Sequence, residues 1–363
     1  GKSNRSRRGA GGHEFSLSLG AGRRRAEAAR NLDECDIAVE RPIRLPGKAR
    51  FDEELGSLGV EQAQSALGDA VHETARGLLR AWFGWLKARV QADEWNSQAS
   101  LLRQQGEVAA RSVRAGDAPR LEQTLAEAAT AQAEAAAVQA GMRAAVAAAE
   151  LTQHYPGILL PERPPLATPA PVSEPHAYWQ ERILEHNHEL ASARAEVKLR
   201  QTQIARSQAD EIPDPTVGVR HASESGGNER VTGLYLSIPL PGRARAAATE
   251  GARAQLDMAV QKEAALLRKL NAEISATHAG AAAAYEGWRM AQFAAQAMAR
   301  NAELIARAYA LGEASLSDTL NARRLAVESR LASSTAQLEA AEARYRLMLD
   351  AHLLWTLDDH PAH

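Results

Sequence analysis

The sequence predicts a mainly α-helical protein with a small β part, built as two copies of one unit. In each copy a pair of strands precedes a long helical hairpin. Three observations carry this prediction: a strand-to-helix junction that occurs twice, two very long stretches without proline, and four short stretches in which apolar and polar residues alternate. The first marks where each long helix begins after a strand, the second concerns the length of the helices, and the third concerns the strands.

The repeated junction is the clearest sign of a duplication. Residues 45–50 read LPGKAR and residues 240–245 read LPGRAR, so that five of the six positions are identical. A second pair of segments lies at nearly the same offset, with RSVRAGDA at 111–118 and RAYALGEA at 307–314. Two matched segments at nearly constant separation are far less likely to arise by chance than one. Such an internal repeat determines how the whole fold is interpreted. They indicate a tandem duplication of one long unit.

The alternating stretches predict two β-hairpins. In HEFSLSLG (13–20) apolar residues recur at every second position, and in residues 36–45 they do so except at Arg41. The pattern returns in 216–221 and, from Leu234 to Leu240, in 231–240. A period of two residues is typical of strands with one apolar face. The hairpins therefore span 13–45 and 216–240. Each pair of strands is joined by a polar loop, and the first loop contains Arg23, Arg24 and Arg25.

Long helices follow each hairpin. No proline occurs between Gly47 and about Arg114, or between Gly242 and about Ala310. A helix of about 65 residues would be roughly 100 Å long. Glycines then interrupt each stretch, and the return helices are expected to end near 153 and 352, so that the helical hairpins span 47–153 and 242–352.

The domain organisation follows from these elements. The first repeat covers residues 1–153, a proline-rich linker covers 154–175, and the second repeat covers 176–352, followed by a tail at 353–363. The second repeat begins with a helix at 176–211, which ends before two prolines. No matching helix precedes the first hairpin, and the amino terminus lacks Met and an apolar leader. We expect that processing or truncation removed the segment before it.

Composition excludes several classes of protein. The net charge is −2, which gives no reason to expect a nucleic-acid partner. The single cysteine, Cys35, excludes an intrachain disulfide and a four-cysteine zinc site. No run of 18 apolar residues is present, so no transmembrane helix is expected. No phosphate loop, HExxH motif or catalytic triad pattern occurs, which predicts a protein that is not an enzyme and has no cofactor or metal site.

Several segments, taken together, resemble the TolC-like outer membrane efflux proteins over nearly the whole chain. They are HNHELASARAEV at 186–197, IPDPTVGV at 212–219, LSIPLPGRAR at 236–245 and GEASLSDTLNARR at 312–324. The form RPIRLPGKAR at 41–50 is most similar to the CzcC-type heavy-metal branch. No single segment is decisive, but their order, spacing and duplication are specific.

The resemblance implies a homotrimer in the outer membrane, with its helical part in the periplasm. Each protomer would give four strands to a closed twelve-stranded barrel in the lipid, and the helices would form a hollow tunnel. The partners implied are a periplasmic adaptor protein and an inner membrane pump, expected to be of the proton-driven RND type. The expected cargo is heavy-metal cations. The alternatives are a type I secretion or drug-efflux conduit and, from another class, a soluble structural coiled-coil protein.

The resemblance also assigns roles to individual residues. The helix turns would dock the adaptor and the residues that follow them would narrow the tunnel, where carboxylates favour cations. Asn321 stands where a second acidic position is expected. The assigned residues are Arg111, Gly116, Asp117, Arg307, Gly312 and Glu313 for docking, Asp318 and Glu122 for the gate, and Pro46, Gly47, Pro241 and Gly242 for the strand-to-helix junctions.

Plainer roles are open for several of these residues. Asp318 could be only a charge at a helix amino terminus, and the two arginines could only pair with acids on neighbouring helices. His186 and His188 are two apart on the predicted helix, which favours surface histidines over a metal pair. The segment DDHPAH at 358–363 is expected to be a disordered end. Trp82 and Trp85 are expected to pack together.

Overall fold

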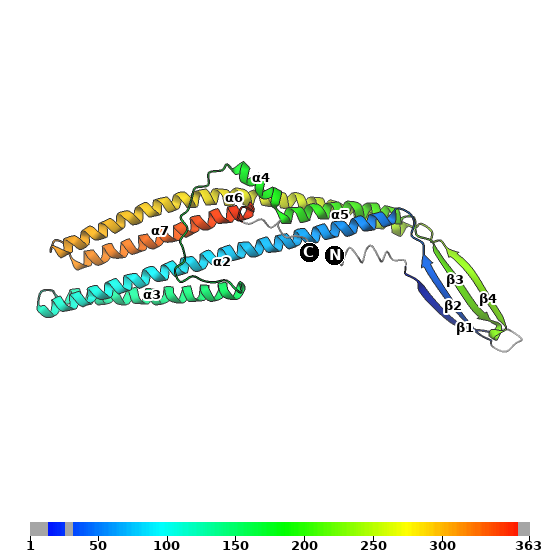
Figure 1. The fold of residues 1–363 in the computed structure, drawn as a ribbon, viewed down its shortest axis with the longest axis horizontal. Helices are drawn as coiled ribbons and strands as arrows, with labels where there is room; N and C mark the ends of the chain where they lie inside the picture. Colours follow the sequence, from blue (N-terminus) through cyan, green and yellow to red (C-terminus); the bar gives the residue numbers. More distant parts are fainter. Residues whose placement is uncertain (1–13, 26–31, 355–363) are drawn as a thin grey trace. The chain divides into compact units, whose positions relative to one another are not determined.

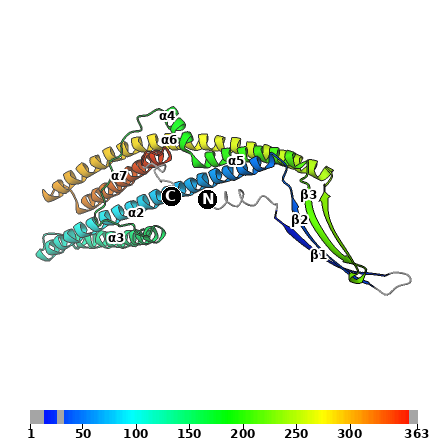
Figure 2. The same cartoon turned by 45° about the vertical axis from the view of Figure 1, so that its right-hand side comes forward.

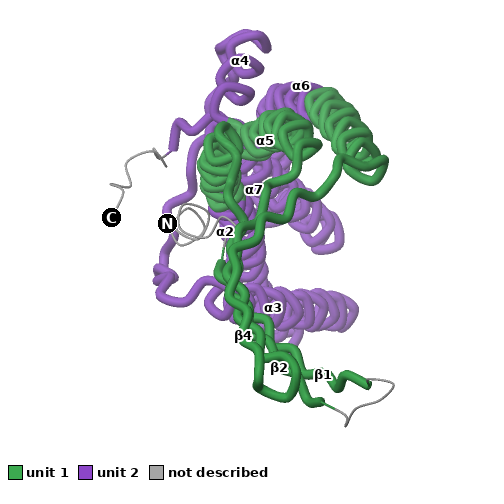
Figure 3. Tube along the Cα trace, turned by 90° about the vertical axis from the view of Figure 1, so that its right-hand side faces the viewer, with its two compact units in different colours: residues 1–69, 187–269 green, residues 70–186, 270–363 purple. Residues whose placement is uncertain are grey.

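The computed structural model describes residues 14–25 and 32–354. The chain forms two compact units, which Figure 3 distinguishes by colour: residues 1–69 with 187–269, and residues 70–186 with 270–363. Each unit contains equivalent parts of both predicted repeats. The first unit holds both strand pairs, and the second holds both helix turns.

The first unit contains a four-stranded antiparallel sheet, as predicted. Its strands lie side by side in the order β1-β2-β3-β4 (Figure 1), so β1 and β4 form the two edges. The strands are β1 Ser16–Arg24, β2 Leu32–Pro42, β3 Thr216–Glu224 and β4 Glu229–Ser237, with a short 3-10 turn, η1 Ser225–Gly227, between the last two.

One face of the sheet is apolar and exposed. The register places Leu17 opposite Val39, Val39 opposite Val219, and Val219 opposite Leu234, so one row of apolar side chains crosses all four strands. Leu17 is 61% exposed and Leu234 is 85% exposed. Because side chains alternate between faces, most polar residues lie on the opposite side, although Arg41 and His221 share the face of Val39 and Val219.

On the polar face, long side chains lie flat against glycines of neighbouring strands. The Tyr235 ring covers Gly218, where an added Cβ would lie 2.5 Å from the ring, and its hydroxyl donates to Glu40 at 2.6 Å. The Asp36 carboxylate covers Gly20 in the same way. The glycines therefore let these side chains lie along the sheet instead of projecting from it.

The long helices of the two repeats have equal lengths. Helix α2 Lys48–Ala115 and helix α6 Arg243–Ala310 each contain 68 residues, and α3 Arg120–His154 and α7 Leu316–Asp350 each contain 35. Figures 1 and 2 show α3 running beside α2 and α7 beside α6. Equal lengths are the expected product of a duplication.

Alanine forms much of the helical core in the second unit. One small cluster joins Ala92 of α2 to Ala140 and Ala144 of α3. Small side chains let the helix backbones approach closely. Because aromatic residues are only 4% of the sequence, few large side chains are present to fill a wider space between helices. The buried residues of α3 recur at spacings of three, four or seven: Ala126, Ala133, Ala137, Ala140, Ala144 and Leu151.

A larger apolar cluster lies beneath the proline-rich linker. Phe83 and Trp85 of α2 pack with Leu151 and Leu338, and linker residue Ile158 packs against them. The prediction that Trp82 and Trp85 pack together is confirmed, with ring centroids 5.1 Å apart. The linker therefore contributes to the core and does more than join the repeats.

The helix predicted over 176–211 is wrong in one respect, because it is two helices. They are α4 His176–His186 and α5 His188–Asp210. Asn187 between them has an extended backbone, and its side chain accepts a hydrogen bond from the Leu190 amide at 2.7 Å. An amide side chain that caps a helix end in this way competes with an unbroken helix. His186 and His188 thus belong to different helices, and both are half-buried.

The predicted loop of the first hairpin is shorter than expected. Arg23 and Arg24 belong to β1, because carboxylates on β2 hold them: Arg23 pairs with Asp33 at 2.7 Å and Arg24 pairs with Glu34 at 2.7 Å. The segment DDHPAH at 358–363 and the residues before 14 lie outside the described part. None of the described helices is long and apolar enough to cross a membrane.

Candidate functional site

The two helix turns have the same backbone geometry. Gly116 and Gly312 have φ angles of +81° and +79°. The Asp117 amide donates to Ser112 O at 2.9 Å, and the Glu313 amide donates to the carbonyl five residues before it at 2.9 Å. These bonds, with one from each glycine amide, are a Schellman motif, which requires the left-handed conformation that glycine adopts most easily. The predicted turns are confirmed.

Two arginines stand beside these turns without a partner. Arg111 and Arg307 each lie five residues before the turn glycine, and both are exposed. Within the described ranges, neither guanidinium makes a hydrogen bond or an ion pair. The plainer alternative, pairing with acids on neighbouring helices, is not seen in the part of the chain that the structure describes. Both charges are free to meet another molecule.

A hydrogen bond joins the two turns. Tyr309, near the end of α6, donates its hydroxyl to Glu122 of α3 at 3.0 Å. Burial, and then this bond to the carboxylate, raise the pKa of the Tyr309 hydroxyl. Apolar packing of Ala126 with Leu316 accompanies the bond. Glu122, predicted as a gate residue, therefore links the first helical hairpin to the second. This contact could not be predicted from the sequence, because its partners are 187 residues apart.

Asp318 forms a capping box at the start of α7. Its carboxylate accepts hydrogen bonds from the Ser315 hydroxyl at 2.6 Å and the Ser315 amide at 3.2 Å, and its own amide donates to the Ser315 hydroxyl at 3.1 Å. These bonds from Ser315 lower the pKa of the carboxyl group. Asp318 is exposed and charged. The local role at the helix start is thus present, and it leaves the carboxylate facing solvent.

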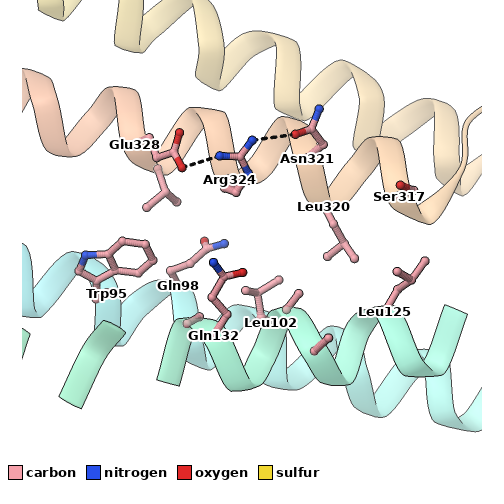
Figure 4. A pocket seen from close by; sticks show the side chains of 14 residues that line it. Trp95, Gln98, Leu102, Leu125, Gln132, Ser317, Leu320, Asn321, Arg324 and Glu328 are labelled. Atoms are coloured by element: carbon pink, nitrogen blue, oxygen red, sulfur yellow. Dashed lines mark hydrogen bonds and ion pairs between the residues drawn. The ribbon is translucent and has the colours of Figure 1, made fainter. Parts of the chain in front are cut away.

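A groove of about 330 Å³ runs between α7 and the hairpin of α2 and α3 (Figure 4). Trp95 and Leu125 line one side, and α7 lines the other. On α7, Arg324 donates to Asn321 at 3.2 Å and to Glu328 at 2.7 Å. Asn321, the neutral residue at the expected second acidic position, is therefore engaged with a cation of its own helix. The two helical hairpins meet here through a partly open seam.

The first strand-to-helix junction is an ion-pair centre in the first unit. Lys48, only 2% exposed, lies directly after Pro46 and Gly47. Its ammonium donates to the Ile212 carbonyl at 2.7 Å and to Asp214 at 2.9 Å. The segment before β3 is thus fastened to the start of α2. Sequence reasoning selected the Pro-Gly pair and missed the lysine after it.

The second junction has the same sequence pattern but different surroundings. Pro241, Gly242 and Arg243 are all exposed. Arg243 occupies the place of Lys48, and it makes no hydrogen bond or ion pair with any described residue. Arg245 donates to the Asp210 carbonyl at 2.8 Å. The first junction is therefore complete within one chain, whereas the cation of the second has no partner among residues 14–25 and 32–354.

A buried acid at the end of α7 was also missed. Asp350 accepts hydrogen bonds from His72 at 3.2 Å and from Arg76 at 2.8 Å, and Arg346 donates to it at 2.8 Å. Burial opposes ionisation, but these bonds outweigh it and lower the pKa of Asp350 to about 2. The His72 ring stacks on His352 with centroids 5.2 Å apart. Over residues 14–25 and 32–354, no set of three or more His, Cys, Asp or Glu side chains could hold a metal ion.

Comparison with known proteins agrees with this architecture. The sequence profile of the family "OEP: Outer membrane efflux protein" matches residues 179–349. No curated protein sequence matches the chain. Among solved structures, the Campylobacter jejuni CmeC outer membrane channel is similar with a TM-score of 0.75 at 14% identity, over 98% of this chain and 80% of that one.

Two further outer membrane proteins have the same fold. The Neisseria gonorrhoeae MtrE outer membrane channel in its open state gives a TM-score of 0.74 at 16% identity, over 96% of this chain and 82% of that one. The outer membrane protein VceC from Vibrio cholerae gives 0.74 at 15% identity, over 96% and 88%. Residues 179–349 thus match the outer membrane efflux protein family, and the chain as a whole has the fold of outer membrane channels.

Proposed function

We propose that this protein is the outer membrane channel of a tripartite efflux system, a passive conduit that carries substrate to the cell exterior. The observation that carries the proposal is the sheet with one exposed apolar face. Its strands contain 9, 11, 9 and 9 residues, and about 9–11 residues suffice for a tilted strand to cross a bilayer. In lipid, unpaired strand edges are too costly, so the sheet must close with other copies. Three copies give a barrel of twelve strands.

The helix turns are the proposed docking site for a periplasmic adaptor. Arg111 and Arg307 are exposed cations that no described residue neutralises, and Asp117 and Glu313 add two exposed acids beside them. The turns at Gly116 and Gly312 present this pattern twice per protomer and six times per trimer. A repeated surface of this kind suits a partner that itself forms a ring. The energy for transport would come from an inner membrane pump of the RND type.

The gate is proposed to lie beside the same turns. The hydrogen bond between Tyr309 and Glu122 holds two helical hairpins together, and breaking it would let them move apart along the groove of Figure 4. Asp318 would contribute a ring of three charges in the trimer, which attracts cations and repels anions. Replacing Asp318 with Asn should reduce cation selectivity in planar bilayers. Unchanged reversal potentials would reject this role.

The cargo is proposed to be heavy-metal cations, and this rests on the resemblance of RPIRLPGKAR (41–50) to the heavy-metal branch. Drugs or a type I secretion substrate are the alternatives, because the pump selects the cargo and the conduit follows it. Cells that lack the gene should become sensitive to cobalt, zinc, cadmium or copper. Sensitivity to drugs alone would remove the metal assignment and leave the conduit intact.

Three measurements test the conduit itself. The protein should fractionate with outer membranes, run as a heat-modifiable trimer in detergent, and give discrete conductance steps in planar bilayers. A soluble structural coiled-coil protein predicts the opposite on all three counts. Recovery of the full chain as a water-soluble species without conductance would therefore replace the conduit with that second candidate.

A further inference from the structure

We propose that β4 of one copy pairs with β1 of a second copy in one fixed register, locked at one end by an ion pair between Arg243 and Glu14, with Glu229 facing Arg24 at the other end. This inference rests on the proposed function, because it needs copies that close a sheet. It goes beyond closure in naming the register and the residues that select it.

The contact between β2 and β3 supplies the template. Where β2 leads into α2, the Leu45 amide donates to the Asp214 carboxylate at 3.0 Å, and Lys48 donates to the same oxygen at 2.9 Å. Asp214 lies two residues before the start of β3. A carboxylate that precedes one strand thus binds the junction that follows its neighbour.

The duplication repeats every part of this template except the contact itself. Leu240 and Arg243 stand where β4 leads into α6, as Leu45 and Lys48 stand after β2. Glu14 lies two residues before β1, as Asp214 does before β3. Glu14 and Arg243 are exposed, and neither has a hydrogen bond or an ion pair among the residues that the structure describes. A second copy would bring these unpaired charges together.

The template also sets the register. In the chain, Pro42 pairs with Thr216, the first residue of β3. The equivalent residues are Ser237 of β4 and Ser16, the first residue of β1, and both strands contain nine residues. Pairing them places all nine residues opposite one another. At the far end Glu229 lies opposite Arg24, which also pairs with Glu34 at 2.7 Å and Glu224 at 3.2 Å in its own chain. Opposite charges therefore face each other at both ends, and the Arg243–Glu14 end joins the two groups that have no partner among the described residues.

The chemistry of the two faces agrees with this register. It sets Leu236 opposite Leu17 and Leu234 opposite Leu19, so the apolar face continues from copy to copy. A slip by one residue would place these leucines opposite serines of the other face. A slip by two would keep the faces but would lose the Arg243–Glu14 ion pair, move Glu229 away from Arg24 and leave two residues of each strand unpaired.

Cysteine cross-linking in the full chain tests the register. With Cys35→Ser as background, Ser16→Cys with Ser237→Cys should form disulfides between copies, because Cα atoms of opposed residues lie about 4.5–5.5 Å apart, within disulfide range. The control, Ser16→Cys with Tyr235→Cys, shifts one partner by two residues to roughly 8 Å, which is too far. Non-reducing gels should show covalent dimers and trimers for the first pair only. Efficient cross-linking of the control pair, or none in trimers of the first, overturns the register.

Charge exchange tests the lock. Arg243→Glu or Glu14→Arg alone should lower the temperature at which trimers dissociate in detergent by several degrees, and the double variant should recover most of that loss. Arg268→Glu, an exposed site on the same helix, should leave it unchanged. No loss in the single variants, or no recovery in the double variant, rejects the ion pair.

The outcomes separate the two proposals. Conducting trimers whose cross-links fit another register would overturn this inference and leave the channel function standing. A chain that neither forms trimers nor conducts would overturn both.

Discussion

At the scale of single residues, one position separates the two junctions. Lys48 is buried against Asp214 and Asp210, whereas Arg243 is exposed. Lysine and arginine look interchangeable in LPGKAR and LPGRAR. A compact ammonium, however, fits a closed site with one carbonyl and two carboxylates, whereas a guanidinium presents a wide planar fork. Lysine in the first junction and arginine in the second therefore each suit their surroundings.

Replacing Lys48 with Met should destabilise the protein by about 3 kcal/mol, because removing one partner leaves a carboxylate uncompensated in a largely closed site. The thermal midpoint followed by circular dichroism measures this. Lys262→Met, at an exposed site on α6, is the matched control and should change little. Equal midpoints for the two variants would show that the buried ammonium contributes no stability.

Asp350 should make stability depend on acid pH. Its pKa in the folded state is about 2, below the ordinary 3.8. The unfolded chain therefore binds the proton more readily, and the contribution is complete above about pH 4 and is lost as pH falls toward 2. It amounts to about 2 kcal/mol. Asp350→Asn should lose this at pH 7 and show a flatter decline below pH 4, unlike the exposed control Asp257→Asn. Parallel acid profiles of Asp350→Asn and the unsubstituted protein would contradict it.

At the scale of elements, the helix turns depend on glycine. Gly312 has a φ of +79°, which costs roughly 1–2 kcal/mol for a residue with a Cβ. Gly312→Val should distort the turn, so efflux with the adaptor should fall sharply while trimers remain. Gly287→Val, within α6 and with open space around it, should leave efflux unchanged. Normal efflux in Gly312→Val would refute docking at this turn.

The bond between the turns makes a second prediction at this scale. Tyr309→Phe removes the hydroxyl that reaches Glu122, so the hairpins should separate more readily and the open probability in planar bilayers should rise. Tyr285→Phe, on the same helix, has no such bond among the described residues and should behave as the unsubstituted channel. An unchanged open probability in Tyr309→Phe would show that the turns are held by packing alone.

The sequence predicted these elements well and their contacts poorly. The alternation of apolar residues, the long stretches without proline and the glycines at the turns are local properties of the sequence. The strands, the long helices and the turns could therefore be predicted from them. The break at Asn187 was not, because an asparagine inside a helical pattern becomes a cap only through the backbone around it. Contacts such as Tyr309 with Glu122 and Lys48 with Asp214 join residues far apart in the chain, and one sequence carries no record of them.

At the scale of the whole molecule, the duplication requires the two helical hairpins to match in length. Removing one heptad from both α2 and α3 would displace their turn by roughly 10 Å along the helices, away from the turn of α6 and α7. The bond to Tyr309 would be lost, and efflux should fail. Removing one heptad from all four helices keeps the turns level and should retain efflux. Equal efflux in both deletions would show that the turns act independently.

The polar face of the sheet has a consequence for the size of what can leave the cell. Because the Tyr235 ring rests on Gly218 and the Asp36 carboxylate rests on Gly20, neither narrows the proposed exit. Any larger residue at either glycine would lift its neighbour into the bore. The width of the proposed exit therefore depends on the missing side chains at Gly20 and Gly218. A larger residue at either position should reduce the export of bulky cargo before that of small cargo.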